Sequence, residues 1–203
     1  NWLVLSSANY FLDDVKELCQ IRGWYYQYKG MNSIPLKLLL ALNNWESWRK
    51  GELLNALEIK NIYEYLGDNV MPGFQKGKTL HSDVKYKIEE CKKDHGLITD
   101  KVWFEAFEGL DPITENYIRN MRANGEQINK NPRIVMSTIH GAKGGEATNV
   151  VLLLNETANT IKGAKKSIQK RDEEYRVWYV GITRTMKNLY LIKCPNKSKE
   201  FKL

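Results

Sequence analysis

The sequence has little cysteine and no long apolar run. Its three cysteines, Cys19, Cys91 and Cys194, are far apart and odd in number, which argues against a disulfide framework or a CxxC metal site. We therefore expect reduced and mostly buried thiols. No apolar stretch approaches the roughly 18 residues that span a bilayer, and the first residues lack a basic start and a cleavage site. These absences predict a soluble intracellular protein without a membrane segment.

The composition indicates a folded chain with an uneven charge. With 203 residues and 42% hydrophobic content, the chain can bury a core in one large or two small domains. The net charge is +7, but residues 130–203 carry 15 Lys and Arg against 6 Asp and Glu, whereas the remainder carries 16 against 18. A basic half is what a phosphate-rich partner requires. A solvated basic surface explains the same charge equally well.

The two ends of the chain have the pattern of an α/β sheet. Strands are predicted at 2–6 and 24–28, with a helix from Asn9 to Gly23 between them whose apolar stripe includes Leu18 and Ile21. The pattern returns late in the chain with strands at 134–138, 150–154 and 189–193, and with a basic linker at 162–171 before a helix. Five strands with helices between them predict an open, mostly parallel sheet. Ligands on such sheets lie beyond the carboxyl ends of the strands, where we expect residues 140–146 and, through its helix, Arg184 to lie.

The middle of the chain reads as a helical insertion between the second and third strands. We predict a helix opened by Pro35 and ended by Gly51, and further helices at 52–66, 82–93, 101–107 and 112–123. The Trp and Leu residues of these helices, such as Leu36, Leu40 and Trp45, are interpreted as core. The predicted organisation is a first sheet segment at 1–30, the insertion at 31–126 and a second sheet segment at 127–203.

Two patterns in the insertion look like sites but lack essential residues. The stretch PGFQKGKT, Pro72–Thr79, ends like a phosphate-binding loop, but GxxxxGK[ST] requires glycine at position 72, and no buried strand precedes it. Cys91 and His95 are spaced i,i+4 on a predicted helix, yet a second pair of metal ligands is missing. We interpret both residues as surface or packing residues.

Two longer motifs resemble the last two motifs of superfamily 1 helicases of the UvrD/Rep type. The sequence STIHGAKGGE from Ser137 to Glu146 is similar to TxHxAKGLE, and EEYRVWYVGITRT from Glu173 to Thr185 is similar to EERRLxYVxxTRA. Gly145, where the family has leucine, is a departure that leaves the turn looser. The resemblance implies a RecA-like fold, and specifically the second motor domain of an ATP-dependent DNA helicase, in which the insertion at 31–126 is an accessory domain. It also implies a place in the cytoplasm of a bacterium, or of the host if the protein is encoded by a phage.

Arg184 is the candidate catalytic residue. Hydrolysis of a phosphoanhydride needs positive charge on the γ-phosphate, and a guanidinium is planar and always charged. On a helical wheel, Tyr175, Trp178, Tyr179 and Ile182 form one stripe that would pack on the sheet, and Arg184 points roughly 170° away from it, with Val177 and Val180 also facing outward. The resemblance implies that this arginine acts as a finger on ATP. A surface arginine paired with an acid is the alternative.

The resemblance also implies roles for six further residues. Glu146 takes the ribose-contacting position, and a carboxylate suits a sugar hydroxyl because it accepts hydrogen bonds. Gly144 and Arg176 are assigned to the nucleotide side, although an ion pair with Asp172 or Glu173 explains Arg176 equally well. Thr138, His140 and Lys143 are assigned to single-stranded DNA. The alternatives are a structural histidine and a surface glutamate.

The motifs that are missing show what else such an enzyme needs. The chain has no intact P-loop, no DExx magnesium motif and no QxYR motif before Trp2. We therefore expect a monomeric motor whose ATP and Mg²⁺ are held mainly by an N-terminal RecA-like domain of the same polypeptide, with single-stranded DNA or a duplex junction as partner. The resemblance implies 3′ to 5′ translocation. Two alternatives are a non-catalytic module that binds nucleic acid or a helicase, and a P-loop kinase built on PGFQKGKT.

Overall fold

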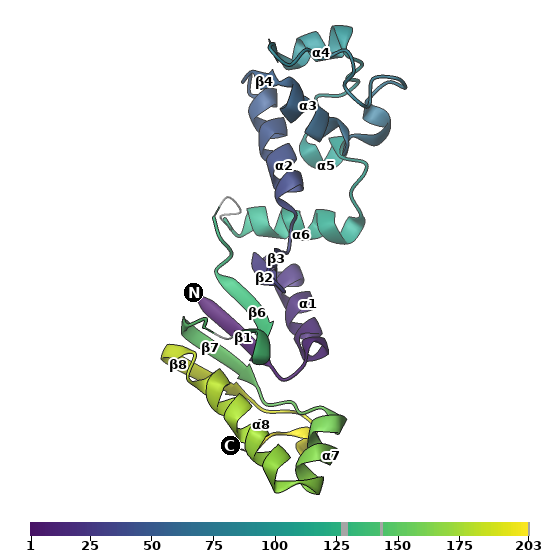
Figure 1. Ribbon diagram of the computed structural model, residues 1–203. Coiled ribbons are helices and arrows are strands. Elements are labelled where there is room, and N and C mark those ends of the chain that lie inside the picture. Colours follow the sequence, from purple (N-terminus) through teal and green to yellow (C-terminus); the bar gives the residue numbers. More distant parts are fainter. Residues whose placement is uncertain (127–129, 143, 203) are drawn as a thin grey trace. The chain divides into compact units, whose positions relative to one another are not determined.

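The chain folds into two compact units. The computed structural model describes residues 1–126, 130–142 and 144–202. Unit 1 comprises Asn1–Ser33 and Asn120–Leu203, and unit 2 comprises Ile34–Arg119 (Figure 1). Unit 2 covers most of the range for which the sequence predicts a helical insertion. Its role as an accessory domain stays a prediction.

Unit 1 is built on a six-stranded sheet with the order β3-β2-β6-β1-β7-β8. All pairs are parallel except β2 with β3, which are joined by a tight turn with positive φ at Lys29 and Gly30. The predicted mostly parallel α/β sheet of the RecA-like kind is confirmed, with the short β3 as an additional strand. The strands are β1 (Trp2–Ser6), β2 (Tyr26–Tyr28), β3 (Met31–Asn32), β6 (Ile134–Thr138), β7 (Ala147–Leu153) and β8 (Thr185–Ile192).

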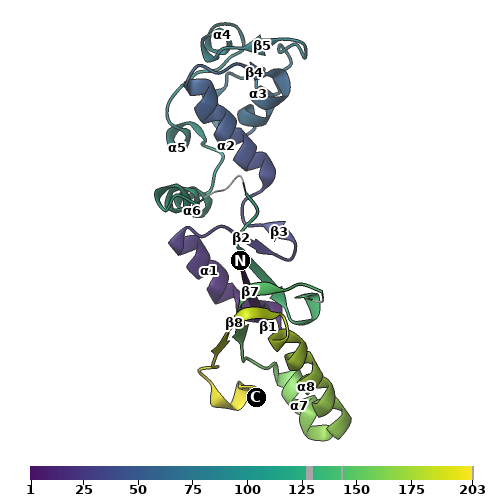
Figure 2. The same cartoon turned by 90° about the vertical axis from the view of Figure 1, so that its left-hand side faces the viewer.

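Helices cover both faces of this sheet. The apolar side chains of β1 alternate between the faces, as the twofold period of a strand requires. Leu3 and Leu5 pack with Trp178 of α8 (Ile168–Ile182) in one core cluster. On the opposite face lies α1 (Asp13–Arg22), and Figure 2 shows α1 and α8 on different sides of the strands. The other helical segments of unit 1 are α7 (Ala158–Lys166) and the 3-10 helices η1 (Asn9–Leu12), η3 (His140–Ala142) and η4 (Lys197–Lys199).

The helix α1 ends where predicted but buries a different face. Gly23 terminates it with a φ of +62°, and a Cβ there would lie 2.4 Å from the backbone carbon of Asn120. The predicted stripe is wrong at Leu18 and Ile21, which are 45% and 62% exposed, whereas Cys19 is buried. Leu18 and Cys19 line a hollow of about 660 Å³ together with apolar residues of the sheet. The face under α1 is therefore only partly covered.

The predicted basic linker at 162–171 is wrong, because it is helical almost throughout. It contains the end of α7 and the start of α8, with Ser167 as the single residue between the two helices. The hydroxyl of Ser167 accepts a hydrogen bond from the backbone N–H of Lys170 at 3.4 Å, which caps α8. Because only Ser167 separates the two helices, the sequence shows no clear boundary between them, and the segment was predicted as a linker.

Unit 2 is mainly helical and has its own core. Trp45 and Trp48 are fully buried, and their indole N–H groups donate to the backbone carbonyls of Lys101 and Tyr86, both at 3.0 Å. The prediction that these tryptophans are core is confirmed. The elements are α2 (Leu36–Arg49), β4 (Leu54–Asn55), α3 (Ala56–Tyr63), η2 (Gly67–Asn69), β5 (Lys85–Tyr86), α4 (Ile88–Asp94), α5 (Trp103–Ala106) and the first part of α6 (Pro112–Ala123), whose residues from Asn120 onward belong to unit 1.

Several helix predictions in unit 2 are only partly right. The helix predicted at 52–66 begins later, at Ala56, because Asn55 and Glu58 form a capping box that fixes the first turn. The segment predicted as a helix at 82–93 starts instead with β5, which pairs with β4. Leu36 and Leu40, which were predicted to be core, are 66% and 47% exposed, and Leu38, Leu39 and Leu42 of α2 are buried instead.

The last helix of the insertion is predicted correctly. Asp111 accepts a hydrogen bond from the backbone N–H of Thr114 at 2.9 Å and so caps α6, as the Asp-Pro pair indicates. The side-chain amide of Asn120, near the end of α6, donates to the carbonyl of Ile21 at 3.0 Å. Within the described ranges, no helix is both long and apolar enough to cross a bilayer.

Candidate nucleotide and nucleic-acid site

The HGAKGGE turn is held by two buried anchors, Ile139 just before it and Ala142 within it, and its described polar side chains are exposed. Ile139 is buried, and its N–H donates to the carbonyl of Ser6 at the end of β1 at 2.9 Å. Ala142 is buried in the same core cluster. His140 and Glu146 are exposed, and Gly144 has a φ of +81°, a conformation that glycine adopts without strain. Lys143 lies outside the described residues.

This turn runs from the carboxyl ends of the strands back to their amino ends. In β6, Thr138 pairs with Ser6 at the end of β1, whereas in β7, Asn149 pairs with Trp2 at the start of β1. Thr138 and His140 therefore lie at the carboxyl ends of the strands, which we call the carboxyl edge of the sheet. Glu146 lies at the amino ends of the strands, which we call the amino edge. The prediction that the whole turn lies beyond the carboxyl ends is wrong, because β6 and β7 are parallel and the turn must return the chain to the start of the next strand.

Thr138 uses its side chain to shape the beginning of the turn. Its hydroxyl oxygen accepts a hydrogen bond from the N–H of Gly141 at 3.1 Å. A threonine hydroxyl that accepts in this way still carries a proton to donate. The half-buried Thr138 and the exposed His140 thus present two hydrogen-bonding groups at the carboxyl edge.

Arg184 lies at the amino edge, next to the end of the turn, and not at the carboxyl ends of the strands where it was predicted, because it precedes the first residue of β8. The helix α8 ends at Ile182 with Thr183 as its cap, so Arg184 lies in the link to β8 and not on the helical wheel from which its direction was predicted. Its backbone carbonyl accepts from the N–H of Ala147 at 3.0 Å, and Ala147 pairs with Thr185. Main-chain bonding thereby places Arg184 beside Glu146, although the two are far apart in sequence.

The guanidinium of Arg184 is bound to the end of its own helix. Its Nε donates to the carbonyl of Val180 at 3.1 Å, and its Nη2 donates to the hydroxyl of Thr183 at 3.3 Å. The side chain is half-buried and is not sunk beneath the sheet. Within the described part of the chain, Arg184 has no acidic partner. It is therefore a cation that is positioned but not neutralised.

The packing face of α8 matches the predicted stripe only in part, since Trp178 and Ile182 pack on the core as predicted. Trp178 and Gly181 are buried, and Val177 and Val180, which were predicted to face outward, pack against the same core. Tyr175 and Tyr179, which were predicted to pack on the sheet, are 50% and 67% exposed. Gly181 permits this close approach, since a Cβ there would lie 3.2 Å from Leu152 and 3.5 Å from Ile139.

Arg176 is exposed on the outer side of α8. In the ranges that the structure describes, it forms no ion pair with Asp172 or Glu173. Glu173 instead accepts from the side-chain amide of Gln169 at 3.3 Å. The alternative explanation of Arg176 as the partner of a neighbouring acid therefore finds no support.

Two carboxylates that influence each other, Glu174 and Glu156, were not singled out from the sequence. Burial raises the pKa of Glu174, and the nearby charge of His140 partly opposes this rise. Burial also raises the pKa of Glu156, and the charge of Glu174 adds to the effect. Glu156 follows the carboxyl end of β7. Glu174 belongs to the quoted EEYR motif, which was the signal that could have identified it, whereas nothing in the sequence marked Glu156.

The two doubtful motifs of unit 2 do not form a site. Only an isolated bridge at Val70 comes directly before Pro72–Thr79 in the described chain, and not a strand. The hydroxyl of Thr79 forms a hydrogen bond with the Nδ1 of His95 at 2.9 Å. Cys91 is buried, which raises the pKa of its thiol to about 12. Across the described residues, no three His, Cys, Asp or Glu side chains gather as metal ligands. All three cysteines are free and buried, as predicted.

The fold and the two motifs are those of a RecA-like domain, with a guanidinium and a carboxylate at one sheet edge and polar groups at the other. The family description "UvrD-like helicase C-terminal domain" matches residues 85–196, which is more than half of the chain. The chain belongs to this family. No curated protein matches it. The family is one of helicases, which are ATP hydrolases that act on nucleic acid.

Proposed function

We propose that this chain is the second motor domain of an ATP-dependent DNA helicase or translocase. Its amino edge would complete an ATP site whose P-loop belongs to an N-terminal RecA-like domain of the same polypeptide. Its carboxyl edge would contact single-stranded DNA. The observation that carries the proposal is the main-chain bond of 3.0 Å from Ala147 to Arg184, which brings a cation and the carboxylate of the neighbouring Glu146 to one edge.

The residues at the amino edge suit a nucleoside triphosphate. Arg184 offers a guanidinium without an acidic partner among the described residues, and such a group stabilises negative charge on phosphate oxygens. The exposed carboxylate of Glu146 can accept hydrogen bonds from ribose hydroxyls. At Gly144 a Cβ would meet nothing within 4 Å, so the backbone is open to a ligand. Arg176 would supply a second cation toward the nucleotide or the facing domain.

Arg184 must exchange partners to act on phosphate. In the conformation observed, its Nε is bound to the carbonyl of Val180 and its Nη2 to Thr183. A phosphate oxygen carries full negative charge and is a stronger acceptor than a neutral carbonyl. The helix end would therefore hold the guanidinium ready and release it when a phosphate approaches. In the shared site, bound ATP with Mg²⁺ supplies the anhydride bond that is cleaved.

The carboxyl edge suits the backbone of a single strand. Thr138 and His140 offer a hydroxyl and an imidazole beside backbone N–H groups of the turn, and Lys143 would add a cation. These groups contact phosphate and sugar without reading the bases. Because one short turn joins both edges, closure of the ATP site would shift the DNA contacts at the other end. This linkage is what a translocating motor requires.

The test is the substitution Arg184→Ala in the longer polypeptide that includes the P-loop domain. We expect the ATPase kcat to fall by at least about 10³-fold, because arginine fingers contribute 10³ to 10⁵. Arg184→Lys should recover only part of the loss, because an ammonium lacks the planar fork. Single-stranded DNA binding and Tm should change little. The 203-residue chain alone should show negligible turnover.

The opposite result would favour the non-catalytic alternative. In that case, Arg184→Ala would leave turnover unchanged and lower only Tm, because the side chain would serve solely to bind the carbonyl of Val180. The chain would then be a binding module that retains the fold of the motor domain.

A further inference from the structure

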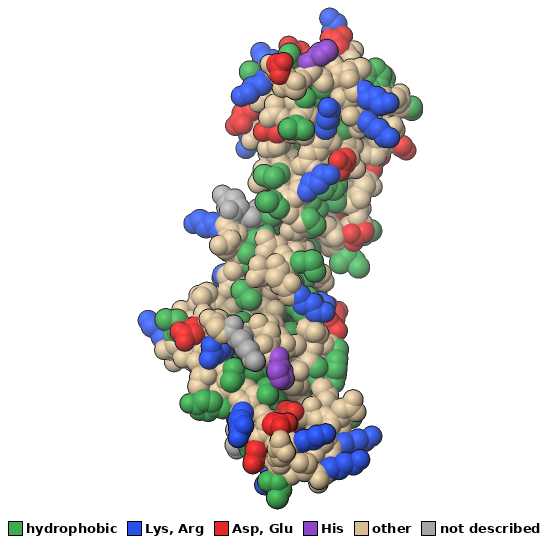
Figure 3. Space-filling view, viewed as in Figure 1, with side chains coloured by type: hydrophobic (Ala, Val, Ile, Leu, Met, Phe, Trp, Pro, Cys, Tyr) green, Lys and Arg blue, Asp and Glu red, His purple; other side chains and the backbone are tan. Residues whose placement is uncertain are grey.

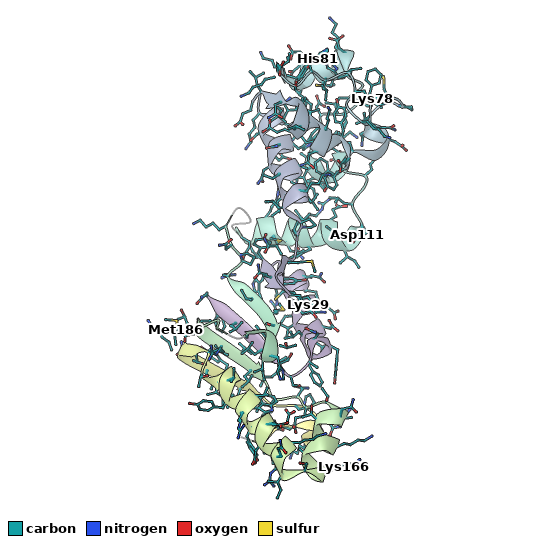
Figure 4. All side chains as sticks on the ribbon, in the orientation of Figure 1. Lys29, Lys78, His81, Asp111, Lys166 and Met186 are labelled. Carbon is teal, nitrogen blue, oxygen red and sulfur yellow. The ribbon has the colours of Figure 1, made fainter. Side chains whose placement is uncertain are left out.

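A group of cations lies on α7 and the first turns of α8, outside the two motifs. We call it the basic patch, and its members are all exposed: Lys162, Lys165, Lys166, Lys170 and Arg171. None of them forms an ion pair within the described ranges. Figure 3 shows Lys and Arg side chains gathered over α7, and Figure 4 labels Lys166 at the end of this helix.

The two helices bring these cations together. Lys162, Lys165 and Lys166 are spaced i, i+3 and i+4, so they share one side of α7. The aliphatic stem of Lys170 crosses from α8 to α7, since a Cβ on Gly163 would lie 3.4 Å from its Cδ. The basic patch is therefore one surface formed by both helices and not a run of separate charges.

This arrangement does not serve the stability of the helices. Lys162 and Lys166 are like charges at i,i+4, which destabilise a helix. Lys170 lies in the first turn of α8 and Arg171 follows it, where the helix dipole disfavours cations, and this turn has no acidic residue. Only Lys165 and Lys166, in the last turn of α7, are favoured by the dipole. The other three cations, Lys162, Lys170 and Arg171, do not stabilise the helices through the dipole, which favours an anionic partner for this surface.

The position of the basic patch relates it to the carboxyl edge. The helix α7 follows β7 at its carboxyl end, and α8 carries Glu174, whose charge interacts with His140. The patch thus lies on the side of the sheet where the DNA contacts Thr138 and His140 are proposed. The partly buried Ile161 and Ala164 leave α7 without an open apolar face of the kind that inserts into lipid.

We propose that the basic patch binds the phosphate backbone of the single strand beyond Thr138 and His140 and so extends the nucleic-acid contact of this domain. The inference rests on the proposed function and adds a second contact surface to it. Five mobile cations at an exposed surface neutralise phosphates without base contacts, so the binding should be independent of sequence and sensitive to salt.

The test compares two triple variants of the 203-residue chain. In K162Q/K165Q/K166Q, the basic patch loses three cations. The control K50Q/K85Q/K93Q removes three exposed lysines of unit 2 that form no ion pair in the described part of the chain. Both variants change the net charge equally. Binding of a fluorescent oligothymidylate is measured by anisotropy over a range of salt concentrations, with circular dichroism to check folding.

We expect the patch variant to bind at least about tenfold more weakly at low salt. The slope of log K against log salt should fall by about 2, because each single-strand phosphate contact contributes about 0.7. The control should keep the slope of the wild type. Unchanged affinity and slope in a folded patch variant would refute the inference and leave the proposed function intact.

Two further measurements separate the possible failures. A T138A/H140A variant that loses binding while the patch variant does not would support the proposed DNA edge and reject the patch. If the wild-type chain does not bind the oligonucleotide, the patch inference and the DNA role are both rejected, while the ATPase test of Arg184 still decides the motor role. Patch-dependent binding of phosphatidylserine vesicles, without such dependence for DNA, would assign the surface to lipid instead.

Discussion

The two edges of the sheet in unit 1 are built in different ways. At the amino edge, Glu146 and Arg184 are brought together by main-chain bonding between β7 and the link into β8. At the carboxyl edge, His140, Glu156 and Glu174 come from a turn, a strand end and a helix, and their charges influence one another. The first edge depends on strand register, and the second depends on how α8 packs on the sheet.

This difference indicates which changes should affect one edge and which should affect both. Strand register at the amino edge is fixed by backbone bonds, so it tolerates the loss of many side chains. The carboxyl edge requires α8 to lie against the sheet, and α8 also leads directly to Arg184. The helix is therefore the element on which both edges depend, and the following substitutions test this dependence.

The largest effect on both edges is expected from Trp178→Ala. Trp178 is 1% exposed and stacks on Phe201 with 4.5 Å between ring centroids. Its loss should lower the free energy of unfolding by about 3–5 kcal/mol, because a large cavity forms under α8. Urea denaturation followed by circular dichroism measures this change.

The matched control is Trp178→Phe, which keeps an aromatic ring in the same place. The indole N–H of Trp178 has no hydrogen-bond partner among the described residues, so little polar energy is lost. We expect a cost below about 1.5 kcal/mol. Equal costs for both variants would mean that stacking on Phe201 does not hold the helix.

A smaller effect, confined to the amino edge, is expected from Gly144→Ala. The φ of Gly144 is +81°, and a Cβ would meet nothing within 4 Å, so the cost is backbone strain alone. We expect a loss of about 1 kcal/mol in the free energy of unfolding. Gly145→Ala should cost less than about 0.5 kcal/mol, because the new Cβ would lie 3.6 Å from the carbonyl of Ala142 without a positive φ. Similar losses at both glycines would show that the turn relaxes.

The smallest effect concerns the carboxyl edge and depends on pH. Because burial raises the pKa of Glu156, the folded state holds its proton more tightly, and stability falls as the pH rises through this raised pKa. Glu156→Gln should therefore be more stable at neutral pH by a few tenths of a kcal/mol, a size limited by solvent screening. The advantage should vanish below about pH 4. Thermal melts across this range measure it.

Glu174→Gln provides the comparison for this pH effect. The substitution also removes the burial cost of a carboxylate, but it removes the attraction between Glu174 and His140 as well. It should therefore gain less than Glu156→Gln. A gain that does not change with pH in either variant would contradict the idea that ionisation is its cause.

Prediction from sequence succeeded where the signal was local and failed where it depended on packing partners. Short apolar runs identified the strands β1 and β6. Gly23 identified the end of α1, and the Asp-Pro pair identified the cap of α6 at Asp111. The buried face of α1 was predicted incorrectly, and that of α8 only in part, because Trp178 and Ile182 pack on the core as predicted while Tyr175 and Tyr179 are exposed. A helical wheel gives the spacing of apolar residues but does not show which of two adjacent stripes faces the sheet. Tyrosine is partly apolar, so Tyr175 and Tyr179 were assigned to the buried stripe although they are exposed.

The candidate site divides in the same way. Arg184, Glu146, Thr138 and His140 were identified from the motifs, but their separation onto two edges was not. Glu156 carried no signal, because its importance comes from a partner far away in the sequence.

The sequence by itself determined the five strands β1, β2, β6, β7 and β8 in chain order, the two motifs and the concentration of basic residues in the last third of the chain. Only the tertiary structure decided that one turn spans the sheet, that Arg184 stands beside Glu146, and that the cations of α7 and α8 share a surface. The reason is physical. Local propensities act over a few residues, whereas parallel pairing and helix packing join segments whose separation in the sequence leaves no periodic trace.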